Sequence, residues 1–223
     1  PLPVDENGVA AAADTPPELV DRRFTTEDLL PPPTSDGFEA TISPVPPDVV
    51  TRSTWVEECP VALEELAYVT TTFVGFDGGH HTGELLVGAH QAEDIVSVFR
   101  TLFEARFPLE QMRIASPGDL DAPPTGDGNV TSAFVCRPVT GGTNWSEHAY
   151  GLAIDINPFH NPYVRGERVL PELAGAYLDR DRGLPGMITS GDVVTEAFAE
   201  IGWEWGGHWS SLKDYQHFSL NDR

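Results

Sequence analysis

Two segments of the sequence hold the residue types that bind a catalytic metal. The first, SEHAYGLAIDINP, places His148 seven residues before Asp155, which is flanked by two isoleucines. An aspartate on a strand that faces a core costs free energy unless a partner neutralises it, and a metal ion is one such partner. The second segment, GWEWGGHWSSLKDYQHF, places Asp214 three residues before His217.

Two histidines and one carboxylate with a fourth position open are typical of a catalytic zinc site, which lowers the pKa of bound water to about 7. The remaining carboxylate then serves as a general base. Each piece alone is weak evidence, because a histidine beside a glycine is more often structural and a buried aspartate often caps a turn. Their combination in one chain favours a site for one zinc ion.

The pattern around these residues predicts an α+β fold. Residues 67–76 and ELLVGA are expected to form a hairpin, with DGGHHTG as its long loop. Apolar residues at helical spacing predict a helix over residues 91–106. Further expectations are strands at AFVCR, LAIDIN and DYQHFSL, a loop over 116–132, and a helix that begins after an N-cap at Ser190 and ends at Gly202. Strands and helices without regular alternation favour a small antiparallel sheet flanked by helices.

The beginning of the chain has a different composition. Half of the 20 prolines lie in its first 47 residues, among acidic side chains and with Arg22 and Arg23 as the only bases. Proline lacks an amide donor, and a polar segment cannot offset the entropy lost on ordering. We therefore expect residues 1–52 to be a linker or an extended wrapping segment, with at most a short helix around residues 18–30. A single zinc-binding domain is expected over residues 53–223, with compact patterning from Trp55.

Charge and composition exclude several classes of function. The 223 residues include 35 Asp and Glu against 13 Lys and Arg, a formal charge of −22 that repels phosphate backbones, so nucleic acid is not an expected partner. No apolar run approaches the roughly 20 residues of a membrane-spanning helix. The sequence starts at Pro1 without an initiator Met or a signal segment, which suggests a trimmed form of a secreted or cell-envelope protein. In such a protein the pair Cys59 and Cys136 favours a disulfide over two buried thiols.

The motifs together resemble a known family. The pattern S-x-H-x-x-G-x-A-x-D is followed by G-W-x-W-G-G-x-W over residues 202–209 and by D-x-x-H, and every motif position is present. This pattern is similar to that of the zinc D-Ala-D-Ala carboxypeptidases and the related L-Ala-D-Glu cell-wall peptidases, in their actinobacterial branch, which share a fold with the hedgehog signalling domain. The resemblance covers roughly residues 55–220.

The resemblance implies roles for individual residues. His148, Asp155 and His217 would bind zinc, and Asp214 would accept the proton of the attacking water. The metal would lie on a small antiparallel sheet. Arg137 stands where family members carry a basic residue that stabilises the oxyanion, a role suited to a guanidinium; a surface ion pair is the alternative.

Other candidates for contact with a substrate are Ser146, Tyr150, Trp205 and His208, although tryptophans in such a stretch more often form core or wall. In the expected loop that holds His80 and His81, three roles are open for His81: it could reach the site, bind a second ion with Asp77 or His80, or close the hairpin by bonding to the backbone, and we favour this structural role.

The predicted function is hydrolysis of a peptide bond in the peptidoglycan stem, with stem peptides as partners. The cleaved bond stays open between the terminal D-Ala and the L-Ala-D-Glu link. A substrate with a free carboxylate needs a cationic anchor, for which Arg165 and Arg168 are nearest in sequence, and the endopeptidase gains if both face away from the zinc. The alternatives are a zinc-containing module that binds cell wall or protein without catalysis, which the presence of Asp214 disfavours, and hydrolysis of a non-wall peptide or amide.

Overall fold

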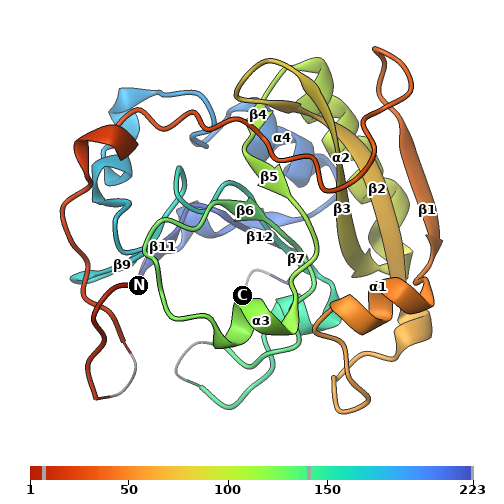
Figure 1. The fold of residues 1–223 in the computed structure, drawn as a ribbon, viewed down its shortest axis with the longest axis horizontal. Coiled ribbons are helices and arrows are strands. Elements are labelled where there is room, and N and C mark those ends of the chain that lie inside the picture. Colours follow the sequence, from red (N-terminus) through yellow and green to blue (C-terminus); the bar gives the residue numbers. More distant parts are fainter. Residues whose placement is uncertain (7–8, 140–141, 222–223) are drawn as a thin grey trace.

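The computed structural model describes residues 1–6, 9–139 and 142–221, and it shows an α+β fold of small sheets and short helices (Figure 1). The helices are α1 Pro47–Arg52, α2 Ala92–Glu104, α3 Pro117–Asp121 and α4 Val193–Glu200. The strands are β1 Ala40–Pro44, β2 Leu66–Gly75, β3 His80–Gly88, β4 Pro108–Leu109, β5 Gln111–Met112, β6 Val130–Thr131, β7 Ala153–Asp155, β8 Tyr163–Arg165, β9 Arg168–Leu170, β10 Glu204–Trp205, β11 Lys213–Asp214 and β12 His217–Ser219.

The largest sheet has the order β1-β2-β3, with β4 beside β2. The predicted β2–β3 hairpin is confirmed, but its turn is shorter than expected, so His80 and His81 are paired residues of β3 opposite Val74 and Phe73. Two further sheets, β10-β12-β7 and β11-β8-β9, carry the candidate site. Both are antiparallel, as expected, whereas β2 with β4 and β5 with β6 run parallel.

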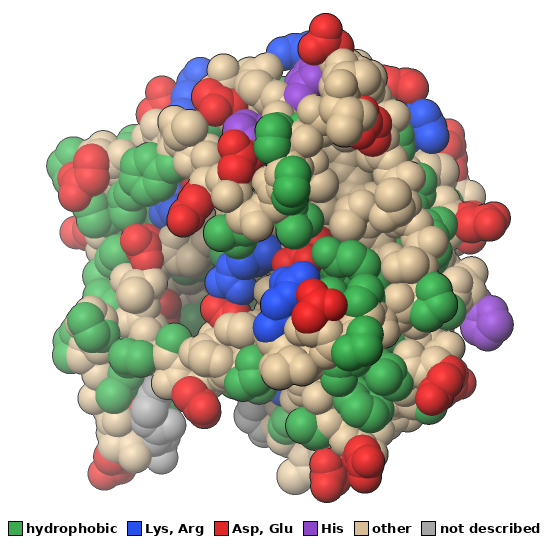
Figure 2. All heavy atoms as spheres, turned by 45° about the vertical axis from the view of Figure 1, so that its right-hand side comes forward, with side chains coloured by type: hydrophobic (Ala, Val, Ile, Leu, Met, Phe, Trp, Pro, Cys, Tyr) green, Lys and Arg blue, Asp and Glu red, His purple; other side chains and the backbone are tan. Residues whose placement is uncertain are grey.

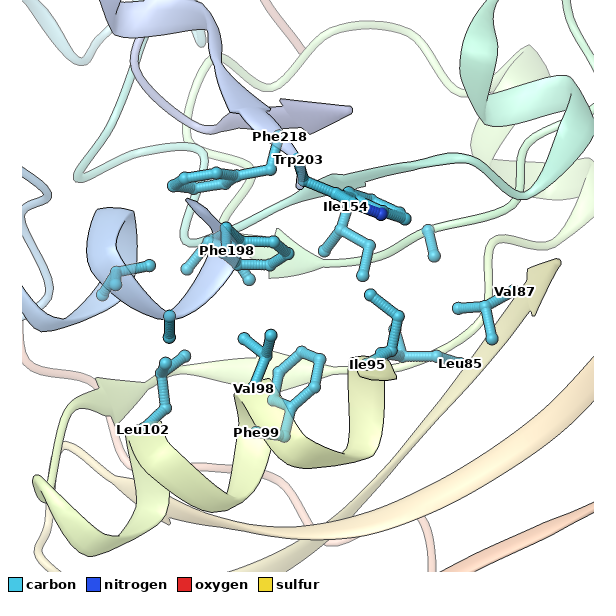
Figure 3. Packing of buried hydrophobic residues seen from close by; sticks show 14 of the residues in the cluster. Leu85, Val87, Ile95, Val98, Phe99, Leu102, Ile154, Phe198, Trp203 and Phe218 are labelled. Atoms are coloured by element: carbon cyan, nitrogen blue, oxygen red, sulfur yellow. The ribbon is translucent and has the colours of Figure 1, made fainter. Parts of the chain in front are cut away.

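Helix α2 confirms the predicted amphipathic helix, and its apolar face forms the floor of the core. Ile95, Val98, Phe99 and Leu102 are all buried. Figure 3 shows these side chains pointing toward a second layer made by Ile154 of β7, Phe198 of α4, Trp203 just before β10 and Phe218 of β12. Phe198 stacks on Phe218 with ring centroids 4.1 Å apart. The two short strands of the candidate site therefore rest on a rigid apolar base.

Three local predictions need correction. AFVCR is extended but is not a strand; it is held by single bonds, from Phe134 N–H to the carbonyl of Leu86 and from Val135 N–H to that of His148. The expected loop over 116–132 contains α3 and β6. Ser190 does not cap α4, because the carboxylate of Asp192 accepts the backbone N–H groups of Val194 and Thr195.

Residues 1–52 hold more regular structure than their composition predicted. The expected short helix is only a 3₁₀ turn, Pro17–Leu19, whereas α1 and β1 were not predicted. β1 pairs with β2 along its whole length. Before β1 the chain runs along one side of the molecule (Figure 1), where Arg22 forms an ion pair with Glu110 at 2.6 Å. This part of the chain contacts the remainder through side chains, through one added strand and through backbone hydrogen bonds, among them Leu2 N–H to the carbonyl of Pro124 and Ala13 N–H to that of Glu172.

The acidic side chains are spread over the surface that Figure 2 shows, while Lys and Arg side chains gather near the middle of that face. On this face the negative charge is therefore distributed and does not form one anionic tract. Among the described residues no helix is both long and apolar enough to cross a membrane.

Candidate metal centre

Strand register places two of the candidate ligands side by side. β7 and β12 are antiparallel, with Asp155 opposite His217 and Ile154 opposite Phe218. Because side chains alternate along a strand, Ile154 and Phe218 enter the core while Asp155 and His217 face the other side together. The carboxylate oxygen Oδ1 of Asp155 lies 3.1 Å from Nδ1 of His217.

The third candidate, His148, comes from a 3₁₀ turn, Glu147–Tyr150, whose first backbone donors are capped by Ser146. Nδ1 of His148 donates a hydrogen bond to the carbonyl oxygen of Ala133 at 2.6 Å, which leaves Nε2 facing Asp155 Oδ1 at 3.3 Å. Gly151 ends the turn with φ +69°, and a Cβ there would lie 2.6 Å from the backbone nitrogen of Gly88. The glycine of the motif thus lets the turn pack against the end of β3.

The donor set fits a tetrahedral zinc ion. One nitrogen or oxygen from each of His148, Asp155 and His217 lies within 4.8 Å of the others, among the residues that the structure describes. Ligands about 2.0–2.2 Å from a tetrahedral ion are about 3.3 Å from each other, close to the 3.1 and 3.3 Å found here. The bond from His148 to Ala133 also orients that ring as an outer partner of a metal ligand does.

The electrostatics of the three residues also suit a cation. Burial alone would raise the pKa of Asp155, but the charge of His148 and hydrogen bonds from His148 and His217 outweigh it and hold that pKa well below its usual range. Asp155 therefore stays ionised beside a positive charge, and a bound cation would take the place of that charge.

These donors open into a cavity of about 900 Å³. Arg137, Ser146, His208 and Asp214 line it, as expected for catalytic or substrate-binding residues. Tyr150 and Trp205, which the sequence also suggested as substrate-binding residues, are not among its lining residues within the described part of the chain. Trp205 instead donates its indole N–H to the carbonyl of Tyr215 at 2.8 Å and is buried.

Trp209, from the same motif, lines the cavity instead, with its ring centroid 5.4 Å from that of His217. The sequence analysis did not name Trp209 as a substrate-binding residue, although the alternation of side chains along a strand distinguishes it from Trp203 and Trp205. Trp203 and Trp205 are spaced two apart in a segment that leads into a buried strand, whereas Trp209 follows the two glycines that break this pattern.

Asp214 lies on β11 and accepts a hydrogen bond from the side chain of Gln216 at 3.1 Å. Burial, and next the negative charge of Asp155, raise the pKa of Asp214 to about 6. Gly206 permits this packing, because a Cβ there would lie 2.7 Å from the backbone oxygen of Asp214 and 3.4 Å from Cβ of His217. A carboxylate with such a pKa accepts and returns a proton near neutral pH.

Arg137 lines the same cavity, on the segment that forms backbone hydrogen bonds with the His148 turn. Its guanidinium donates to the neighbouring carbonyl of Pro138 at 3.2 Å. The predicted disulfide is confirmed: Cys59 and Cys136 are bonded, with their Cα atoms 5.8 Å apart. This bond ties the residue before Arg137 to a loop 77 positions away in sequence.

The other histidines serve different purposes. His208 is exposed at the cavity rim, 3.1 Å from the hydroxyl of Ser190. His81 lies between two carboxylates, with Nδ1 2.8 Å from Asp28 and Nε2 3.2 Å from Asp77. These oxygens approach opposite sides of one ring, so they do not converge on a point, and the structural role favoured for His81 agrees with this geometry.

A comparison with protein families now adds independent information. Residues 140–220 match the model of a family described as D-alanyl-D-alanine carboxypeptidase. This segment is therefore similar to that family over about a third of the chain. The match contains the residues of the candidate centre except Arg137, and it confirms the resemblance inferred from the motifs. It supports a peptidase, and hence a hydrolytic enzyme. No curated protein and no solved structure shows significant similarity to the chain.

Proposed function

We propose that this chain is a zinc peptidase that hydrolyses a peptide bond in the peptidoglycan stem, either releasing the terminal D-Ala or cutting the L-Ala-D-Glu link. The observation that carries the proposal is the convergence of His148, Asp155 and His217 in one cavity with Asp214. The family match to D-alanyl-D-alanine carboxypeptidases supports a cell-wall peptide as substrate. The confirmed disulfide agrees with a secreted or cell-envelope location.

His148, Asp155 and His217 would hold the zinc ion, which when bound polarises a carbonyl and makes a water molecule acidic. Asp214 accepts the proton of that water on its carboxylate and returns it to the leaving amine. Arg137 donates hydrogen bonds to the carbonyl oxygen as negative charge develops on it. Ala133 and Ser146 support these groups without touching the substrate in this proposal. The carbonyl of Ala133 orients the ring of His148, and the side chain of Ser146 caps the turn that carries it.

The role of Asp214 is tested by Asp214→Asn, which keeps the shape of the side chain but cannot accept a proton. We expect nearly normal zinc content and a rate of release of D-Ala or dipeptide from defined muropeptides that is lower by roughly 100-fold or more. Asp155→Asn should lose zinc and activity together. The matched control is Asp94→Asn on the exposed side of α2, which should retain both.

Two outcomes would contradict this assignment. If Asp214→Asn loses its metal while Asp155→Asn keeps it, the two carboxylates have exchanged roles. If Asp214→Asn is fully active, the proposed proton transfer is wrong. A protein that binds muropeptides and zinc but releases no product from any of them would instead be the binding module considered above.

A further inference from the structure

Arg165 is a cation in the cavity that the proposed chemistry does not use. It is exposed, lies at the end of β8 and lines the same cavity as Asp214. Among the residues that the structure describes, no carboxylate lies within ion-pair distance of Arg165, in a chain where Asp and Glu outnumber Lys and Arg by 35 to 13. An uncompensated guanidinium in so acidic a protein suits an anionic ligand.

The β8–β9 hairpin adds to this local positive charge. Its register places Arg165 directly opposite Arg168. Like charges in facing positions destabilise a strand pair unless an anion compensates them. The Nε–H of Arg168 is also buried and has no hydrogen-bond partner within the described part of the chain. Arg168 does not line the cavity there, so Arg165 is the residue that offers this charge to a ligand.

Strand pairing places Arg165 on the strand next to that of Asp214, the proposed general base. β8 pairs with β11, and Tyr163 is opposite Asp214. Tyr163 and Arg165 both line the cavity, as residues two apart on a strand share a face, and about 7 Å separates them along the strand. A guanidinium on a long side chain spans such a distance. Arg137, by contrast, comes from the wall beside His148.

This placement matches the geometry of a leaving amino acid. The amine that receives the proton from Asp214 is attached to the α-carbon that also carries the α-carboxylate of the leaving residue. Resting on the proposed peptidase function, we propose that Arg165 determines specificity by binding a free α-carboxylate on the leaving residue. A terminal D-Ala carries that group, and so does a D-Glu joined through its γ-carboxyl, so both candidate bonds present the same chemistry.

The test is equilibrium binding by calorimetry to zinc-loaded protein in the Asp214→Asn background, which limits turnover. N-acetyl-D-Ala-D-Ala is compared with its C-terminal amide, and L-Ala-D-Glu whose γ-carboxyl is amidated is compared with the analogue in which the α-carboxylate is amidated as well. We expect at least one free acid to bind about 10- to 100-fold more tightly than its amide. The pair that shows the preference identifies the leaving residue. Adding Arg165→Gln should bring acid and amide within about threefold.

Arg168→Gln is the matched control from the same hairpin and should retain the preference for the acid. The inference is overturned if Arg165→Gln leaves the ratio of affinities unchanged, if Arg168→Gln abolishes it equally, or if neither acid is preferred by the background protein. Because the readout is binding, a failure of the hydrolytic function would appear separately, as absent product release by the protein with Asp214 intact.

Discussion

Two clusters of histidine and aspartate in this molecule have similar composition and opposite geometry. In the cluster of His148, Asp155 and His217, which lines the cavity, ring nitrogens of two histidines lie within 3.3 Å of one carboxylate oxygen. In the cluster of Asp28, Asp77 and His81, two carboxylates flank a single ring. The first arrangement makes donor atoms converge, and the second makes them diverge.

The difference shows that residue types alone do not define a metal site. A carboxylate only accepts hydrogen bonds, so His81 satisfies Asp28 and Asp77 together only when both of its ring nitrogens carry protons. A metal ligand requires the reverse, a nitrogen with a free lone pair. The bond from His148 Nδ1 to the carbonyl of Ala133 supplies that condition in the first cluster. The second cluster instead joins the N-terminal segment to the β2–β3 turn.

The largest expected effect separates the two clusters by metal content. Protein dialysed without chelator should contain about one equivalent of zinc. His148→Ala should lower this to near zero and reduce peptide hydrolysis by roughly 1,000-fold or more, because a ligand is lost. His81→Ala should leave the zinc content unchanged. Elemental analysis of both variants decides between them, and zinc that is lost from His81→Ala but retained in His148→Ala would reverse the assignment.

A smaller effect should follow from crowding the convergent cluster without removing any ligand. In Gly206→Ala the added methyl group meets the backbone oxygen of Asp214, so the base and His217 must shift. We expect peptide hydrolysis to fall by roughly 10- to 100-fold, as a displacement of about 1 Å does in other active sites. Gly128→Ala is the control, since no atom lies within 4 Å of the position that its methyl group would take. Full activity of Gly206→Ala would show that the close approach is not required.

A fourth buried histidine, His160, lies outside both clusters and should make the stability of the protein depend on pH. Burial, and then the charges of Arg22 and Arg180, lower the pKa of His160 to about 4, against an opposing hydrogen bond to the carbonyl of Arg22. The ordinary pKa of 6.5 applies to the unfolded chain, so the unfolded state binds more protons between pH 6.5 and 4. Stability present above pH 6.5 is therefore lost as the pH falls through this window, by roughly 3 kcal/mol.

This contribution is measured as a difference, because other groups titrate in the same range. Urea unfolding of wild type and of His160→Gln at pH 7, 5.5 and 4.5 should show the wild type losing stability more steeply than the variant. Parallel curves would mean that the pKa of His160 is the same in the folded and the unfolded chain, and would contradict this prediction.

The smallest expected effect concerns the divergent cluster. His81→Gln keeps one donor but cannot bridge two carboxylates, so the free energy of unfolding should fall by about 1–2 kcal/mol. His90→Gln, at an exposed position, should change it by less than about 0.5 kcal/mol. Urea denaturation measures both. An unchanged stability of His81→Gln would show that the bonds to Asp28 and Asp77 do not hold the N-terminal segment.

The sequence by itself predicted the parts of this protein that depend on local pattern. Helix α2 followed from apolar spacing, the β2–β3 hairpin from β-branched and aromatic runs, and the candidate ligands from motif spacing. The cysteine pair followed from its even count and the expected export. The helix and the hairpin are confirmed because each depends on neighbouring residues, and the disulfide is confirmed as well, whereas the assignment of the metal ligands stays a prediction.

Only the tertiary structure decided which residues meet across long separations. The register of β7 with β12 sets Asp155 beside His217, 62 positions apart, and the packing of β8 on β11 brings Arg165 to the side of Asp214. Likewise β1 was missed because proline-rich composition outweighed its short strand pattern, and only pairing with β2 makes it regular. For AFVCR the opposite error occurred, because a strand was predicted where none forms. Its residues favour a strand, but its backbone hydrogen bonds go to separate partners, so no ladder of paired residues forms. Pairing is a property of two segments, and the sequence of one segment does not contain it.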